Sequence, residues 1–234
     1  MKKKNLLIYI SLVLILPLLG QNIGQLNNTS YMPNKPFSYT ILTGVGYAHR
    51  MGKLNNEMDA QWRDFYRDLH NSMTLNMELY YCLNVRNNVK LNLGITTDFV
   101  SSIAQVYNKS FQHVGLVNKF SCHDQYFYTA PSIMFTKNLN SRITAFGGYH
   151  TGPVYYTRKE EYDEKNFMSN AIALGWGLNA GIGYNLSKNL VTGIKMKCLI
   201  VRIKSVQIGN QSIEYDDPLN ASHITITAFG GFLK

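Results

Sequence analysis

The chain has 234 residues, with 23 Lys and Arg against 14 Asp and Glu, and a formal net charge of +9. The basic residues are scattered and form no stripe, which argues against a nucleic-acid-binding protein. Three cysteines, Cys82, Cys122 and Cys198, follow neither a CxxC nor a metal-site spacing, so we expect no obligatory disulfide. The length suits one β-barrel or one to two ordinary domains.

Residues 1–20 have the layout of a secretory signal peptide. Three lysines precede the apolar run LLIYISLVLILPLL, and Gly20 supplies a small residue before the cleavage point. The run is shorter than the roughly 20 residues of a membrane-spanning helix, and Pro17 interrupts it. We therefore expect export with cleavage of residues 1–20, followed by a flexible N-terminal lead-in over residues 21–36. An exported chain of this kind is either soluble or a barrel.

The first expected strand covers residues 37–50. Aromatic and β-branched side chains share one of its faces, and small or polar side chains share the other. Within the long connection that follows, 51–70, apolar side chains fall at helical spacing and predict a short amphipathic helix. The helix is a candidate partner-binding element, and the alternative is a loop helix packed over the barrel mouth. The side chains concerned are Met58, Trp62, Phe65 and Tyr66.

The alternation continues along the chain and predicts eight strands in all. After the first, they cover residues 71–85, 89–102, 125–139, 142–158, 170–186, 190–206 and 221–233. Pro131 and Pro153 weaken the fourth and fifth strands, because each removes a ladder donor and is a candidate bulge.

The strand at 170–186, NAIALGWGLNAGIGYNL, has the clearest period of two. Ile172, Leu174 and Trp176 belong to a bulky apolar face, whereas Gly175 and Gly177 belong to a small or polar face. The segment is longer than the five or six residues usual for a soluble strand. A long strand with a bulky outer face and a small inner face suits a narrow barrel in lipid.

Short and long connections alternate between these strands. Tight turns lie near residues 86–88, 138–141 and 187–189, and long connections cover 51–70, 103–124, 159–169 and 207–220. This alternation is typical of outer-membrane barrels, which have short periplasmic turns and long outer loops. The predicted fold class is therefore all-β, an eight-stranded antiparallel up-and-down transmembrane β-barrel over residues 37–234.

The three turn segments also carry a resemblance. LNVRNNVKLNLG, FTKNLNSRITAFGG and YNLSKNLVTG each join an aliphatic or aromatic strand end to a new strand that contains glycine. With the glycine-rich strands, they make residues 37–234 resemble small eight-stranded outer-membrane barrels: the OmpA transmembrane domain, OmpX-like proteins and the PorT-like barrel family of Bacteroidota. The resemblance is one of pattern, without a signature specific to one protein.

The resemblance implies a location and a set of partners. The location is a bacterial outer membrane, and the partners are outer-membrane lipid and the barrel-assembly machinery, with no nucleic acid. The long outer loops are candidate contacts for another envelope protein. Barrels of this class often end on an aromatic residue, whereas this chain ends Phe232-Leu233-Lys234, which displaces that signal.

The expected inner faces carry charged side chains, which an eight-stranded interior must accommodate. Such an interior is just wide enough to be filled by its own side chains, and a buried charge needs a partner. We expect a salt-bridged plug in which Glu78 meets Lys195 or Lys197 across the lumen, and the alternative is a narrow ion path. The full set of lumen charges is Glu78, Lys90, Asp98, Lys195 and Lys197.

The functional hypothesis is a non-enzymatic barrel with a structural or interaction role through its outer loops, without a cofactor. No phosphate loop or metal-ligand cluster is visible in the sequence. One alternative is an outer-membrane enzyme that modifies lipid A, although no local signature links a serine to a histidine. A second is a soluble exported ligand-binding barrel. Candidate residues for the enzyme are Ser101, Ser102, His113, His123, Asp124 and His150.

Overall fold

The computed structural model describes residues 38–52, 60–84, 89–111, 115–163 and 165–233. The expected signal peptide, 1–20, and lead-in, 21–36, lie outside the described residues. Contacts group residues Phe37–Lys234 into one compact unit.

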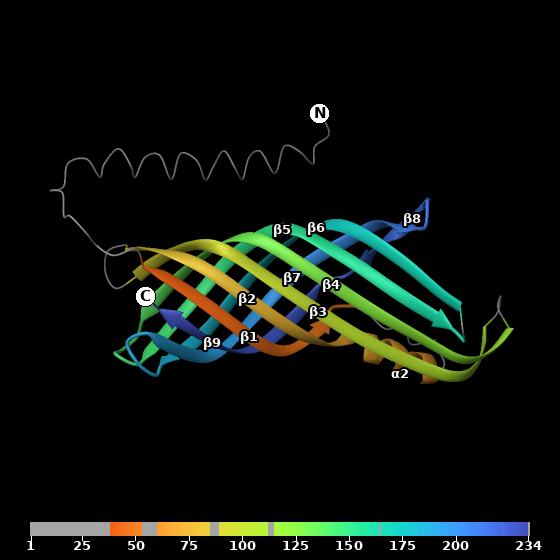
Figure 1. Ribbon diagram of the computed structural model, residues 1–234, viewed down its shortest axis with the longest axis horizontal. Helices are drawn as coiled ribbons and strands as arrows, with labels where there is room; N and C mark the ends of the chain where they lie inside the picture. Colours follow the sequence, from red (N-terminus) through yellow and green to blue (C-terminus); the bar gives the residue numbers. More distant parts are fainter. Residues whose placement is uncertain (1–37, 53–59, 85–88, 112–114, 164, 234) are drawn as a thin grey trace, which may run out of the picture. The chain divides into compact units, whose positions relative to one another are not determined.

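Eight of the nine strands in the described part of the chain close into a ring (Figure 1). The elements are β1 (Tyr39–Arg50), α2 (Ala60–His70), β2 (Asn71–Asn84), β3 (Val89–Phe111), β4 (Gly115–Asn138), β5 (Ile143–Tyr162), β6 (Lys165–Asn185), β7 (Leu190–Ile208), β8 (Gln211–Asn220) and β9 (His223–Leu233). Strands β1 to β7 follow one another in antiparallel order, and β9 pairs with both β7 and β1. The ring confirms the predicted up-and-down barrel.

Side chains alternate between the two surfaces of the barrel wall, as the period of two requires. On β6, Trp176 and Leu178 are 43% and 56% exposed, whereas Gly175 and Gly177 are buried. The other strands also present large apolar side chains outward, and together these form an apolar belt around the barrel. The belt includes Leu75, Ile95, Phe127, Leu174, Ile194 and Ile226. An apolar belt of this kind is the surface that a lipid bilayer covers.

The strands run well past this belt, which corrects the prediction of long irregular connections. β3 and β4 have 23 and 24 residues, and pairs such as Ile103↔His123 and Tyr107↔Lys119 continue their ladder to the tip. β5 and β6 continue likewise to Tyr162↔Lys165. Outside lipid the outward face no longer has to be apolar, so the alternation fades while the backbone ladder continues. Figure 1 shows these extensions at the end of the barrel that carries α2.

The connection expected at 207–220 contains the ninth strand, β8, which pairs only with β7 among the described residues. Gly209, with a φ of +58°, occupies the left-handed conformation that turns β7 into β8. The pairing shifts register between Ser205↔Glu214 and Ile203↔Leu219, so a bulge lies within β8.

The two prolines cause a gap in the β4–β5 ladder without a bulge. The pairs Tyr128↔Val154 and Ser132↔His150 flank the gap in the same register. Pro131 and Pro153 lie within it and are exposed on the outer surface. The lost donors therefore cost ladder hydrogen bonds but do not displace the strands.

Candidate functional site

A cluster of ion pairs occupies the centre of the lumen. Glu78 Oε1 lies 2.7 Å from Lys195 Nζ and 3.5 Å from Lys197 Nζ, so the predicted contact across the lumen is present. Asp98 Oδ2 lies 2.7 Å from Lys197 Nζ. These four side chains are at most 5% exposed, and two acids balance two lysines. Asn76 joins the cluster by donating a hydrogen bond to Asp98 and accepting one from Lys195.

An apolar and aromatic layer closes the lumen on the α2 side of this cluster. The rings of Tyr126 and Tyr156 pack at a tilt of 32° with centroids 5.0 Å apart, and both side chains are buried. They pack in one core cluster with Val154, Leu199 and Val201, all at most 1% exposed. The lumen is therefore filled by side chains at this level.

A third buried carboxylate, Asp124, lies toward the α2 end of the lumen, beyond the apolar belt. Asp124 accepts two 2.7 Å hydrogen bonds from Arg158 and one from Tyr156, and Arg50 Nη1 lies 3.2 Å away. Burial by itself would raise the pKa of Asp124, but the Arg158 and Arg50 guanidiniums and the Tyr156 hydroxyl hold it below its usual value. Asp124 therefore serves as an ion-pair hub that ties β4 to β1 and β5.

The helix α2 packs on the inner surface of the extended strands. Phe65 and Leu69 are buried against Val106, Phe120 and neighbouring side chains. Trp62, Phe65 and Tyr66 contact the protein's own strands, as in the alternative of a loop helix packed over the barrel mouth, while Met58 lies outside the described residues. Partner binding by this helix stays a prediction. The amphipathic face is covered by the fold itself.

A serine and a histidine meet on the outer surface, just beyond the belt. Ser101 Oγ lies 2.8 Å from His123 Nε2, on adjacent strands β3 and β4. Sequence reasoning missed this pair because the two residues are 22 positions apart and only the β3–β4 register brings them together. The distance is that of an activated nucleophile and its base.

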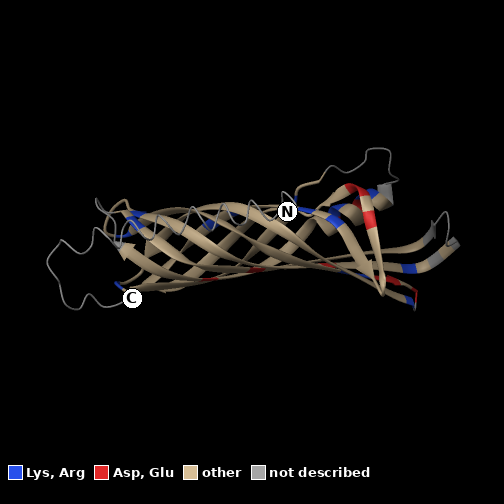
Figure 2. Cartoon of the chain, turned by 90° about the horizontal axis from the view of Figure 1, so that it is seen from above, with Lys and Arg blue, Asp and Glu red and all other residues tan. Residues whose placement is uncertain are grey.

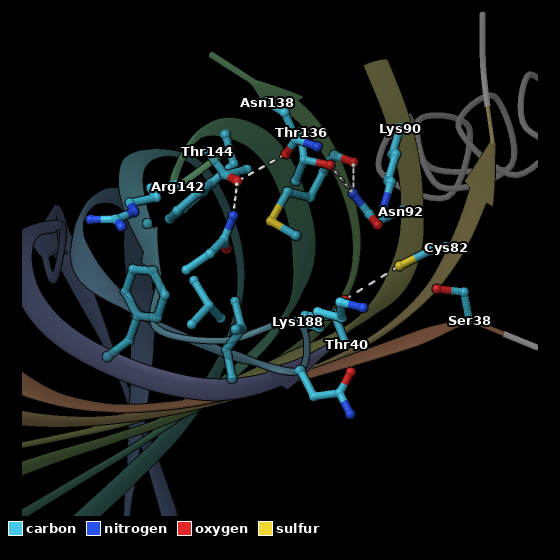
Figure 3. Close-up of a pocket in the computed structure, with 18 of the residues that line it drawn as sticks. Ser38, Thr40, Cys82, Lys90, Asn92, Thr136, Asn138, Arg142, Thr144 and Lys188 are labelled. Carbon is cyan, nitrogen blue, oxygen red and sulfur yellow. Dashed lines mark hydrogen bonds between the residues drawn. The ribbon is translucent and has the colours of Figure 1, made fainter. Parts of the chain in front are cut away.

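The turn end of the barrel contains an open cavity of about 600 Å³ (Figure 3). Lys90 lines this cavity, but it is exposed and does not join the central cluster. It therefore lies at the end of the lumen and not among the paired lumen charges. Arg142 and Lys188 also line it, and the described lining residues include no Asp or Glu. Figure 2 shows the same asymmetry, with acidic positions absent from the turn end and present toward the α2 end.

Among the described residues, no group of three or more His, Cys, Asp and Glu side chains could hold a metal ion. No helix within the described ranges has the length and hydropathy needed to cross a membrane.

Comparison with known proteins supports the fold alone. No protein-family model matches the chain, and neither does any curated protein. The outer-membrane protease OmpT of Escherichia coli matches with a TM-score of 0.50 and 10% identity, over 88% of this chain and 99% of its own. Ail, the attachment invasion locus protein of Yersinia pestis, matches with a TM-score of 0.45 and 13% identity, over 85% and 99%.

Neisserial surface protein A is also similar, with a TM-score of 0.41 and 9% identity, over 85% of this chain and 96% of its own. The likeness to OmpT, together with the ring of strands, assigns the chain to the outer-membrane β-barrel fold. At these identities the comparisons carry no information about activity.

Proposed function

We propose that this protein is a non-enzymatic barrel of a bacterial outer membrane, exported with a cleaved signal peptide. It acts through an outer platform, which we define as the parts of β3, β4, β5 and β6 that extend beyond the apolar belt. The observation that carries the proposal is the length of the strands. A membrane-spanning strand needs about 9–11 residues, whereas β3 and β4 have 23 and 24. More than half of each strand is therefore available beyond the lipid, as a rigid surface for contacts.

The platform has the properties of an interaction surface. Its inner face is filled by α2, which stiffens it, and its outer face keeps apolar side chains exposed. Ile103, Tyr107 and Leu116 are 58%, 57% and 70% exposed on the β3–β4 hairpin. Exposed apolar side chains on a rigid sheet are a common basis for protein–protein contact. We further propose that the chain belongs with OmpX-like or PorT-like barrels and that the barrel-assembly machinery inserts it into the membrane.

Labelling of an introduced cysteine in intact cells tests location and orientation together. Leu116→Cys, at the tip of the β3–β4 hairpin, should react with a membrane-impermeant maleimide in intact cells. Asn189→Cys, in a tight turn at the opposite end, should react only after the membrane is opened. The unsubstituted protein controls for its three native cysteines. Recovery of the protein in the soluble periplasmic fraction, or reaction of both variants in intact cells, would contradict the proposal.

The Ser101–His123 pair favours a second candidate, an acyl-transfer enzyme acting on lipid at the outer surface. His123 would take the proton of the Ser101 hydroxyl as Ser101 attacks an ester carbonyl, and would return it to the alcohol that leaves as the ester bond breaks. Water would then hydrolyse the acyl-serine and release the fatty acid. Mass spectra of lipid A from cells with and without the protein test this. Ser121→Ala is the control, because Ser121 lies on the same face of β4 as His123. If the wild type and Ser121→Ala remove an acyl chain from lipid A whereas Ser101→Ala does not, the enzyme replaces the first proposal. Identical spectra from all strains would eliminate the enzyme.

A further inference from the structure

We propose that the turn-end cavity binds a small amphipathic anion, meaning a phosphate or carboxylate headgroup attached to a short apolar chain. The cavity volume of about 600 Å³ lies within the roughly 300–1,000 Å³ of small-molecule sites. It lies at the end of the barrel opposite the outer platform, so this inference is independent of the proposed function.

The charge at the cavity selects an anion. Lys90, Arg142 and Lys188 contribute three positive side chains to its lining, and no described lining residue is acidic. Figure 3 shows Lys90 and Arg142 on opposite sides of the cavity. The Glu78 carboxylate cannot neutralise them, because it is buried in the lumen centre and paired with Lys195. Cations around a concave, low-dielectric wall concentrate a positive potential in its interior.

Fixed polar groups line the walls between these cations. Asn92 is 1% exposed, and its Nδ2 donates to the Met134 carbonyl at 3.0 Å and to Thr136 Oγ1 at 3.2 Å. Asn185 Nδ2 donates to Thr144 Oγ1 at 3.3 Å, while its buried Oδ1 has no hydrogen-bond partner among the described residues. A buried acceptor without a donor is costly. The hydroxyl of a singly protonated phosphate headgroup would supply that donor, whereas a carboxylate would not.

The inner end of the cavity is apolar and closed. Leu42, Val191 and Phe229 are buried there and form one cluster, against which Phe146 packs. The Phe146 and Phe229 rings meet edge to face with centroids 5.5 Å apart. Beyond Phe229 lies Lys195, whose Nζ is 5.9 Å from the ring centroid. An apolar chain can therefore lie on this floor while its headgroup stays at the cationic mouth.

Calorimetric titration of the full-length protein in phosphatidylcholine nanodiscs tests the proposal, with empty nanodiscs as the blank. Hexyl phosphate combines both halves of the expected ligand, whereas inorganic phosphate and 1-hexanol each lack one half. We expect saturable one-to-one binding of hexyl phosphate, at least tenfold tighter than either. The affinity of hexanoate, compared with that of hexyl phosphate, identifies the preferred headgroup. Binding of either anion supports the site.

Matched variants distinguish the cavity from general surface charge. Lys90→Gln combined with Lys188→Gln should weaken hexyl phosphate binding about tenfold, because both lost cations line the cavity. Lys137→Gln removes an exposed cation at the same end that does not line the cavity, and should change affinity less than twofold. Retention of the folded band on unboiled gels verifies each variant. Equal losses in both variants, binding of 1-hexanol as tight as that of hexyl phosphate, or heats equal to the blank would overturn the proposal.

Discussion

At the scale of single residues, the central ion cluster gives the sharpest expectation for stability. Glu78 is fully buried and lies nearest to Lys195, whereas Lys197 also has Asp98. Glu78→Gln should destabilise the barrel by about 3–5 kcal/mol, because it leaves a buried lysine without its carboxylate. The urea midpoint of the protein in lipid vesicles measures the loss.

The distances within the cluster also predict which second substitution relieves that loss of stability. Lys195→Met in the Glu78→Gln background should recover part of the stability, since it removes the orphaned charge. Lys197→Met in the same background should not, because it orphans Asp98 while Lys195 stays unpaired. If the two double variants are equally stable, the pairing described for the cluster is wrong.

The two faces of β6 differ in their tolerance of substitution. A Cβ placed on Gly177 would lie 2.5 Å from the Cys198 carbonyl oxygen and 2.5 Å from His150 Cε1, so Gly177→Ala forces the wall to shift. We expect it to cost about 1–3 kcal/mol through overpacking. Trp176→Leu keeps an apolar side chain on the lipid face and should cost less. Comparable midpoints for the two variants would contradict this difference between the faces.

At the scale of elements, the docking of α2 should depend on pH. Burial lowers the pKa of His70 to about 4, with Arg50 and His49 adding to the effect and Asp124 opposing it. The ordinary pKa is about 6.5, so the folded state favours neutral His70. This contribution to stability is complete above pH 6.5 and is lost as the pH falls from about 6.5 toward 4.

Fluorescence can report this loss, because the chain has two tryptophans and Trp62 is the one on α2. In a Trp176→Phe background, the Trp62 emission should shift as α2 loosens over that pH window. His70→Gln should flatten the response, because glutamine does not titrate. If the His70→Gln variant keeps the same pH profile, protonation of His70 does not cause the loosening of α2.

At the scale of the whole molecule, the filled lumen predicts that the barrel conducts no steady current. The central ion cluster and the Tyr126–Tyr156 layer both obstruct the path between the two ends. Planar-bilayer recording of the purified protein should show no stable conductance steps, with a general porin as the positive control. Reproducible porin-like steps would favour an ion path through the lumen.

Much of the barrel was predictable from local pattern. Alternation over residues 170–186 located β6 and identified which of Trp176 and Gly177 faces the lumen, because a strand places successive side chains on opposite sides. The same logic put Glu78, Lys195 and Lys197 on inner faces, and the need to pair buried charge predicted their contact. These inferences succeeded because lipid imposes a strict apolar requirement on one face of every strand.

Where that requirement ends, the sequence became less informative. Beyond the belt, β3, β4, β5 and β6 continue as paired strands whose outward side chains are mixed, and the ladder depends on backbone groups that every residue carries. Prediction therefore assigned residues 103–124 to a loop. The packing of α2 against Phe120 likewise depends on strand extensions that alternation did not reveal.

The sequence by itself determined the barrel class, the order of its ring strands and which face of each strand points into the lumen. These follow from the two-residue alternation of side chains and from the polarity of the surroundings on each side of the wall. Register and closure decided the rest. They brought Ser101 to His123, and Arg50 and Arg158 to Asp124, and they left Lys90 at an open basic cavity instead of in the central cluster. Such contacts join residues far apart in the chain, and only the completed hydrogen-bond ladder specifies which of them are neighbours.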